Sequence, residues 1–275
     1  MALSVCTFNV NSIRSRIDLI SRWLSEKRDV DILCLQEIKC QSEQFPFEAF
    51  ESLGYSCAVN GQKRLNGVAV CSKIPFSEIK MEFDDEILDR EKRLIEVKTE
   101  QTAVLNCYIP RGGEVGSERY DYKMEFFDAL RAYVKGLLER EERVVVLGDF
   151  NVALEDIDVY DPELFEGAVG FLPSEKEKMR SLLKCGLHDC FRELHPESRS
   201  FTWWDYRSAG IWRDEGMRID YILANERMCG ECLGAEVDLW TRRRRSPTPS
   251  DHAPLIAEFG SLGGSSVTDL KQTAD

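Results

Sequence analysis

The sequence predicts an α/β fold in which two mixed β-sheets pack face to face and helices cover their outer surfaces, a four-layer sandwich. Two observations support this prediction. Short apolar runs recur along the chain, and several are continuous enough to be strands buried on both faces. Only three stretches show helical periodicity, so the expected strands outnumber the expected helices.

The expected elements are as follows. Ten apolar runs are expected to be strands: Leu3–Phe8, Ile32–Leu35, Tyr55–Val59, Gly67–Cys71, Leu94–Val97, Ala103–Tyr108, Val144–Leu147, Phe201–Trp204, Ile219–Leu223 and Leu255–Phe259. The expected helices are Ile13–Glu26 with Ser12 as N-cap, Arg119–Arg140, and Ser174–Leu183 with the capping-box spacing Ser174…Glu177. Residues 1–259 contain no convincing linker and predict one domain, and the Gly/Ser-rich residues 260–275 predict a flexible tail.

Composition and charge bound the class of protein. The chain has 275 residues, 43% of them hydrophobic and 31% charged, which is typical of a soluble globular protein. A net charge of −13 argues weakly against a nucleic-acid partner. Four consecutive arginines, Arg242 to Arg245, nevertheless lie just before Ser250-Asp251-His252, with Arg207, Arg213 and Arg218 earlier in the chain. A basic rim round a site and a merely solvated loop both remain open.

The cysteines and the N-terminal residues indicate the cellular compartment of the protein. The N-terminal residues lack the features of a secretion signal, and no apolar run approaches the roughly 20 residues that span a bilayer. Cys6, Cys34, Cys71 and Cys107 lie inside apolar runs and are expected to be buried reduced thiols. Cys229-Gly-Glu-Cys232 has no second pair, which argues against structural zinc. We expect a cytoplasmic monomer with no membrane partner, associated with the nucleoid if the source is prokaryotic.

Polar residues at the ends of apolar runs suggest a phosphodiesterase site. Glu37 and Asp251 are hard oxygen ligands suited to Mg²⁺, with Mn²⁺ as an alternative. Asp149 could align or deprotonate an attacking water, with Asn151 donating a hydrogen bond. Asp220 could fix the tautomer of His252 and raise its pKa. The His252 imidazole could then donate a hydrogen bond to a phosphate oxygen of the substrate, and the Tyr108 phenol could donate to the same oxygen.

Each of these residues also has a structural interpretation. Asp149 could cap a turn, Asn9 and Asn11 could satisfy backbone groups, and His252 and Tyr108 could be packing residues. Their joint occurrence at five strand ends favours a site.

In this order, the motifs resemble the exonuclease III family of abasic-site endonucleases, within the endonuclease/exonuclease/phosphatase superfamily. The resemblance rests on six segments and runs from Leu3 to Phe259: Phe8–Arg16, Leu35–Lys39, Asn106–Pro110, Gly148–Asn151, Arg218–Asp220 and Ser250–Pro254. It implies a DNase I-like sandwich. It also implies metal-site residues Asn9, Asn11, Glu37 and Asp251, and a catalytic set of Tyr108, Asp149, Asn151, Asp220 and His252. Whether Asp149 or Tyr108 activates the water stays open.

A second group of segments bears on the substrate. Phe201–Ser208 and Gly216–Asp220 are similar to segments that, in the family, wall a pocket for a flipped-out abasic sugar, so the expected wall here is Trp203, Met217 and Ile219. Alternation predicts that only one of Trp203 and Trp204 faces the site. Arg111 departs from the Gln or Asn that family members often have, and the loop 242–249 is unusually basic; Arg111 and Arg207 are expected to contact DNA.

The resemblance implies a Mg²⁺-dependent repair enzyme for double-stranded DNA. It would hydrolyse the phosphodiester 5′ to abasic sites and leave a 3′-hydroxyl. The 3′-phosphatase, 3′-phosphodiesterase and 3′-to-5′ exonuclease activities would accompany this, since one site could act on blocked 3′ ends as well. Two alternatives remain: a phosphatase of the same fold acting on a phosphoinositide or another small phosphoester, and a catalytically inert lesion-binding scaffold.

Overall fold

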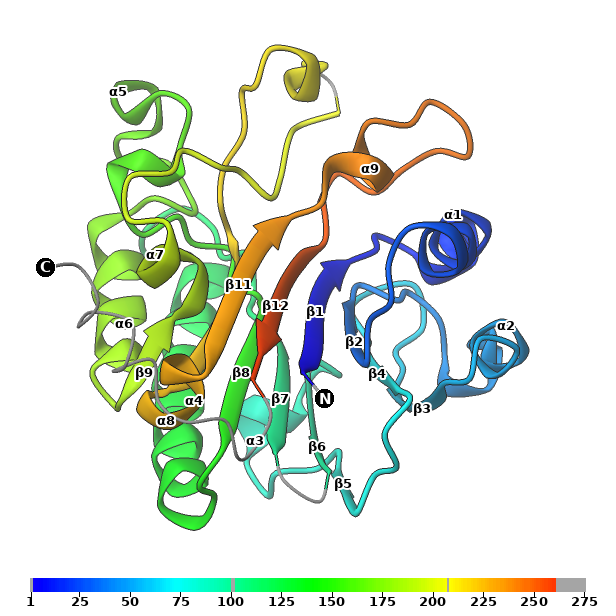
Figure 1. Cartoon of the computed structure of the whole chain (residues 1–275). Helices are drawn as coiled ribbons and strands as arrows, with labels where there is room; N and C mark the ends of the chain where they lie inside the picture. The colour runs from blue at the N-terminus through cyan, green and yellow to red at the C-terminus, as the bar shows by residue number, and fades with distance from the viewer. Residues whose placement is uncertain (1, 100–101, 207, 261–275) are drawn as a thin grey trace, which may run out of the picture.

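The structure is a computed structural model that describes residues 2–99, 102–206 and 208–260. It contains two six-stranded mixed sheets packed face to face with helices outside, which confirms the predicted four-layer sandwich (Figure 1). The first sheet has the order β11-β12-β1-β2-β4-β3, and the second β5-β6-β7-β8-β10-β9.

The strands match most of the expected runs. The first sheet consists of β1 (Leu3–Asn9), β2 (Ile32–Gln36), β3 (Ser56–Asn60), β4 (Val68–Ser72), β11 (Cys232–Val237) and β12 (Leu255–Phe259). The second consists of β5 (Glu78–Lys80), β6 (Leu94–Lys98), β7 (Ala103–Tyr108), β8 (Val144–Asp149), β9 (Leu187–Asp189) and β10 (Asp220–Asn225). The predicted strand Phe201–Trp204 is wrong: it is irregular, and only Trp203 makes isolated bridges, to Met217 and His252.

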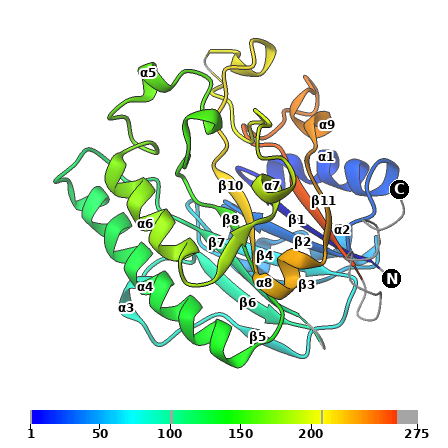
Figure 2. The ribbon, with the colours of Figure 1, turned by 60° about the vertical axis from the view of Figure 1, so that its left-hand side comes forward.

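Helices cover both outer faces. They are α1 (Ile13–Glu26), α2 (Phe47–Glu51), α3 (Glu86–Asp89), α4 (Glu118–Arg140), α5 (Pro162–Phe165), α6 (Pro173–Leu183), α7 (Cys190–Leu194), α8 (Glu226–Gly230) and α9 (Leu239–Arg242). In Figure 2, α4 and α6 lie side by side over the second sheet. The three long helices coincide with the predicted ones, whereas the short ones span too few turns to show a period.

The two predicted helix starts have different outcomes. Ser12 is the N-cap of α1, as predicted, although its side chain makes no capping hydrogen bond and instead contacts the hydroxyl of Ser15 at 3.1 Å. The predicted capping box at Ser174 is wrong. Ser174 lies inside α6, because Pro173 is the first helical residue. The residue that reaches back is Glu175, whose Oε2 accepts hydrogen bonds from the backbone N–H groups of Gly170 and Leu172 at 2.7 and 3.1 Å. Proline suits the first helical position because it has no N–H to satisfy.

Three apolar layers hold the sandwich together. Side chains of both sheets, including Val5, Val70, Val104 and Leu147, interdigitate between the sheets. A second layer lies between the first sheet and α1, around Trp23, and a third lies between the second sheet and α4 with α6. Strands β1, β2, β4, β7 and β8 are buried along nearly their whole length, so continuous apolar runs identified them.

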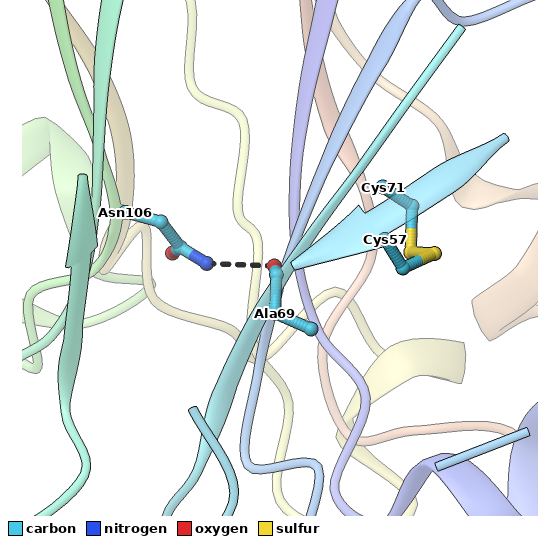
Figure 3. Close-up of a disulfide and its surroundings, with 4 residues drawn as sticks. All are labelled: Cys57, Ala69, Cys71 and Asn106. Atoms are coloured by element: carbon cyan, nitrogen blue, oxygen red, sulfur yellow. Dashed lines mark hydrogen bonds between the residues drawn. A yellow bond between two sulfur atoms is a disulfide. The ribbon is translucent and has the colours of Figure 1, made fainter. Parts of the chain in front are cut away.

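One polar link crosses the layer between the sheets. The Asn106 side chain on β7 donates to the carbonyl oxygens of Leu35 and Ala69 in the other sheet, both at 3.0 Å. Figure 3 shows the hydrogen bond to Ala69. The Asn106 side-chain oxygen in turn accepts from Gln36 Nε2 at 2.7 Å. These groups are buried, so each needs its protein partner.

Cys71 is not a reduced thiol, which corrects the prediction for this residue. It is buried as expected but forms a disulfide with Cys57, directly opposite it in the antiparallel register of β3 and β4 (Figure 3). Opposed residues on paired strands share one face, so the two sulfurs meet. Cys6, Cys34 and Cys107 are buried free thiols. None of the described helices is both long and apolar enough to cross a membrane.

Candidate active site

The predicted site residues converge because of the strand directions. Strands β1 and β2 are parallel, and β12 runs antiparallel to β1, so the end of β1, the end of β2 and the start of β12 share one edge. In the other sheet, β7 and β8 are parallel and β10 is antiparallel to β8, with Asp220 opposite Asp149. The residues that follow or precede these strand ends therefore meet at one rim, the upper edge in Figure 1.

Positive backbone φ angles turn several of these side chains toward each other. Asn11, Glu37 and Asn151 have φ values of 43°, 50° and 52°. This region is unfavourable for residues with a Cβ, and such strained positions concentrate at functional sites. Gly148 has a related role: a Cβ there would lie 1.8 Å from the carbonyl oxygen of Cys107, so glycine is required for β8 to approach β7 and deliver Asp149 to the rim.

Asn9 joins carboxylates from the two sheets. Its Nδ2 donates to Glu37 Oε1 at 2.9 Å and to Asp149 Oδ2 at 2.8 Å. Its Oδ1 accepts the backbone N–H of Asn11 at 3.0 Å. The structure thus presents the amide nitrogen of Asn9 to the acids, and its place among the metal-site residues stays a prediction. Asn9 itself is fully buried, and Ser250 Oγ donates to its carbonyl oxygen at 2.7 Å.

Glu37 stands beside a lysine that sequence reasoning overlooked. Lys39 Nζ lies 2.7 Å from Glu37 Oε2 and donates to Asn11 Oδ1, also at 2.7 Å. Tyr108 Oη donates to Glu37 Oε1 at 2.7 Å. Burial alone would raise the pKa of Glu37, but Lys39 and these hydrogen bonds outweigh it and lower the pKa. Glu37 and Asn11 therefore direct oxygens at a common cationic group, which fits a site for a metal cation.

Asp251 forms the other side of the same rim. Its Oδ1 accepts from Asn11 Nδ2 at 2.9 Å and its Oδ2 accepts from Trp203 Nε1 at 3.1 Å. Burial opposes ionisation, but His252 and these hydrogen bonds lower the Asp251 pKa. Asp251 thus stays charged and available to a cation.

His252 is held between two buried acids. Its Nδ1 is 2.8 Å from Asp220 Oδ2, and its Nε2 is 3.7 Å from Asp149 Oδ2. Burial alone would lower the pKa of His252, but Asp220 and Asp149 raise it to about 10. Asp149, Asp220 and His252 are also the one described set of three potential metal ligands whose atoms all lie within 4.8 Å of one another. A protonated imidazole has no lone pair for a metal, so we consider this set a proton-handling group.

Asp149 has a pKa suited to proton transfer. Burial raises its pKa to about 7, against the opposing effect of His252. Its Oδ1 accepts the backbone N–H of Asn151 at 2.9 Å, which fixes the carboxylate plane. The side chain of Asn151 donates to the carbonyl oxygen of Ile109 at 3.0 Å. The Tyr108 pKa is raised well above its usual value by burial and by Glu37, so the phenol stays protonated.

An apolar hollow adjoins the acids. A cavity of about 190 Å³ is lined by Glu37, Tyr108, Arg111, Asp149, Asn151, Phe165, Val169, Gly170, Trp203, Met217, Ile219, Asp251 and His252. Trp203, Met217 and Ile219 thus lie on it together, whereas Trp204 is buried in a separate cluster. Phe165 and Val169 were missed, because no sequence pattern connects the segment after α5 with this wall. Arg111 is exposed at the cavity, and Arg207 lies outside the described residues.

The four arginines of the run 242–245 differ in their surroundings. Arg242 is buried, and its guanidinium donates to the carbonyl oxygens of Trp204 and Asp251 at 3.2 and 3.3 Å. Arg244 stacks 3.9 Å above the Trp240 ring. Arg243 and Arg245 are exposed. Arg242 therefore supports the segment that carries Asp251, whereas Arg243 and Arg245 are exposed cations.

A buried ion pair supports the turns that carry Arg111 and Asn151 and was also missed. Lys123 and Glu175 are fully buried and 2.6 Å apart. Lys123 Nζ also donates to the carbonyl oxygens of Asn151 and Arg111 at 2.9 and 3.1 Å. It thereby fixes two turns that carry site residues.

Comparison with known proteins agrees with this geometry. Residues 6–252 match the model of the Endonuclease/Exonuclease/phosphatase family. The chain is 34% identical to exodeoxyribonuclease III of Haemophilus influenzae over 92% of this chain and 98% of that protein. It is 31% identical to an exodeoxyribonuclease of Bacillus subtilis, with the same coverage of each.

Solved structures agree in the same way. A 3′ phosphatase, NExo, from Neisseria bound to a product DNA hairpin superposes with a TM-score of 0.90 at 36% identity. An AP endonuclease from Archaeoglobus fulgidus gives 0.89, also at 36% identity. Each comparison covers 94% of this chain and 100% of the other. The chain belongs to the endonuclease/exonuclease/phosphatase family. Within it, the chain is an enzyme, an exodeoxyribonuclease III-like nuclease of DNA repair.

Proposed function

We propose that this nuclease hydrolyses the phosphodiester on the 5′ side of an abasic site in duplex DNA, leaving a 3′-hydroxyl, and that it also removes blocking groups from 3′ ends. One observation carries the proposal. An apolar hollow walled by Trp203, Met217 and Ile219 opens directly onto the carboxylates of Asp149 and Asp251. A baseless sugar fits an apolar slot that a full nucleotide does not, and extrusion costs least where no base is stacked.

The metal in this proposal is Mg²⁺, held by Glu37 and Asp251 with the Asn11 amide. When bound, Mg²⁺ neutralises charge on the phosphoryl group and stabilises the leaving oxygen. Tyr108 and Asn9 donate hydrogen bonds to Glu37 and so orient it. Asn9 is thus a positioning residue, since its nitrogen faces the acids.

Asp149 is the residue proposed to align and deprotonate the water. It is fixed by Asn9 and by the backbone N–H of Asn151, and its pKa of about 7 lets it accept a proton near neutral pH. The protonated phenol of Tyr108 is unsuited to that role. His252, held by Asp220, donates a hydrogen bond to a phosphate oxygen from its Nε2. Arg111, exposed at the rim, contacts a flanking DNA phosphate.

The same arrangement serves 3′ ends. Each proposed reaction breaks the bond from phosphorus to a 3′ oxygen, with the phosphate beside the acids and any group that stays on the phosphate facing the hollow. The solved Neisseria relative is itself described as a 3′ phosphatase, which supports this part of the proposal. A phosphoinositide phosphatase would need several cations for its phosphates, whereas Arg111 and His252 are the basic side chains in the described cavity lining.

The test is a cleavage assay on three matched duplexes carrying a tetrahydrofuran abasic site, a 3′-phosphate at a nick, or no damage. We expect Mg²⁺-dependent incision 5′ to the lesion and release of phosphate at the nick, with slower attack on the undamaged ends. Absence of incision in Mg²⁺ and in Mn²⁺ would sink the endonuclease proposal. If the protein bound the lesion without cutting it, the scaffold alternative would be favoured. Hydrolysis of a soluble inositol phosphate instead would favour the phosphatase alternative.

A further inference from the structure

The Cys-x-x-Cys segment meets a third cysteine in the fold. Cys229 lies in α8 and Cys232 is the first residue of β11, whereas Cys190 begins α7. Helix α7 packs against β11, and α8 packs against β9 and β10. Figure 1 shows α7 beside β11 and α8 close to β9. The three side chains therefore pack into one cluster, with Cys190 buried and the other two half-buried. The sequence showed only a lone Cys-x-x-Cys.

Cys190 interacts with both outer cysteines, which pack against the same apolar cluster. The interaction with Cys190 lowers the pKa of each outer thiol, and the same interactions together with burial raise the pKa of Cys190. Acidic neighbours oppose the effect, namely Glu193 and Asp189 at Cys229 and Glu258 at Cys232, but the outer thiols remain the more acidic. Thiolate character and access to solvent are the two properties that make a cysteine reactive.

We propose that Cys190, Cys229 and Cys232 form a peroxide-reactive thiol site, in which Cys190 closes a disulfide with whichever outer cysteine has been oxidised. In the first step, the outer thiolate attacks one peroxide oxygen, the O–O bond breaks, and the sulfur becomes a sulfenic acid as hydroxide leaves. The hydroxide takes the proton that the thiol released on ionising and becomes the first water. In the second, the Cys190 sulfur attacks the sulfenic sulfur. An S–S bond forms, and the departing hydroxide takes the Cys190 proton as a second water. One peroxide is reduced and two thiols are oxidised.

The arrangement suits alternating disulfides better than a metal. A cation needs its ligands round one point, and the described set of three ligand atoms within 4.8 Å of one another is the one at the active site. Here the central Cys190 interacts with two other cysteines. The cluster also lies at the opposite end of β10 from Asp220, because α8 follows Asn225. It is therefore separate from the proposed nuclease chemistry and does not depend on it.

The chain offers a matched control. Cys185, just after α6, is also a half-buried free thiol, but its Sγ contacts the carbonyl oxygen of Ser181 at 3.5 Å rather than another sulfur. It has comparable access to solvent without the interaction with Cys190. Reaction with peroxide should therefore distinguish it from the outer thiols of the cluster.

The experiment treats the full chain with hydrogen peroxide, blocks the remaining thiols by alkylation and maps the peptides without reduction. We expect Cys190 linked to Cys229 or Cys232, and loss of these thiols about tenfold or more faster than loss of Cys185. In Cys190→Ser, the outer thiols should accumulate as sulfenic acids that dimedone traps. In Cys229→Ser/Cys232→Ser, whose changes lie at half-buried positions, Cys190 should stay reduced. Cys185→Ser should behave as the unmodified protein.

Three results would overturn the proposal. One is a Cys190 thiol that stays free while the outer thiols are oxidised. Another is oxidation of Cys185 at the same rate as the cluster. The third is stoichiometric binding of Zn²⁺ that shields all three cysteines from alkylation, which would make the cluster a metal site. If Cys190→Ser fails to fold, judged by circular dichroism, the double variant still decides between these outcomes.

Discussion

At the scale of the residue, the side chain of Asn9 connects acidic residues from the two sheets. Its single amide nitrogen donates to Glu37 from one sheet and Asp149 from the other. The sequence indicated that Asn9 belongs to the site, since it ends an apolar run. It did not indicate which atom of the amide faces the acids, because that depends on the φ of 50° at Glu37 and on the packing of two sheets.

Asp149→Asn should reduce turnover on an abasic duplex by about 100- to 10,000-fold, because an amide cannot accept the water's proton. Binding of the same duplex should change little, since Asp149 is proposed to act on the water and not to hold the DNA. Single-turnover cleavage and fluorescence anisotropy would measure the two effects. The control Asp156→Asn alters a side chain that is 79% exposed and should leave both unchanged. A turnover within a few-fold of the starting enzyme would refute the role of Asp149.

Glu37→Gln should chiefly raise the Mg²⁺ concentration needed for half-maximal cleavage, by about 10-fold or more, since a neutral amide binds a hard cation more weakly. High Mg²⁺ should restore part of the rate. Titration of Mg²⁺ against the initial rate provides the measurement, with the exposed Glu43→Gln as control. An unchanged Mg²⁺ requirement would show that Glu37 is not a ligand.

At the scale of the element, the start of β10 depends on buried charges. Arg218 is 1% exposed, and its guanidinium bonds to Asp158 at 2.7 and 3.1 Å and to Asp189 at 2.6 Å. Arg192 adds another bond to Asp158 at 2.6 Å. This network fixes the segment between Met217 and Ile219, which line the hollow. A buried charge that loses its partner is strongly destabilising.

The Asp158 network should make stability depend on pH. Burial opposes ionisation, but Arg218 lowers the pKa of Asp158 below its usual value. The ionised Asp158 carboxylate therefore contributes fully to the free energy of unfolding above about pH 4, its pKa in the unfolded chain. This contribution is lost as the pH falls through the lower pKa that Asp158 has in the folded protein. Asp158→Asn should cost about 3–5 kcal/mol near neutral pH and flatten this acid dependence. Urea unfolding from pH 3 to 7 would measure it, with exposed Asp18→Asn as control. The prediction would be contradicted if the free energy of unfolding depended on pH in the same way in both variants.

At the scale of the whole molecule, the two sheets are joined by apolar packing and by Asn106. Asn106→Ala should lower the free energy of unfolding by about 2–4 kcal/mol, because it leaves buried groups of Leu35, Ala69 and Gln36 unsatisfied. Chemical denaturation would measure the loss. Val104→Ala, in the same layer between the sheets, removes only apolar contacts and should cost less. An Asn106 variant as stable as the starting protein would show that the link contributes little.

The sequence predicted the layers of the fold and most of the residues at the rim of the site. The features that it did not predict have physical reasons. Interior strands such as β8 were found because both their faces are buried. Strands β5 and β9 have three residues each at sheet edges, and β11 is an edge strand that is only partly buried, so none has a continuous apolar run. Lys39 and the Lys123–Glu175 pair were missed because their contacts arise only in the tertiary fold. The prediction of a free Cys71 failed for the same reason, since only strand register reveals Cys57 opposite it.

The pairing of β1 with β12 has a consequence for protein synthesis. Strand β1 lies between β2 and β12, and Asp251 and His252 immediately precede β12. Until β12 has been synthesised, β1 exposes an unpaired edge, and Asn9 has no Ser250 beside it. We therefore expect a chain that stops before residue 250 to lack nuclease activity and to be prone to aggregation.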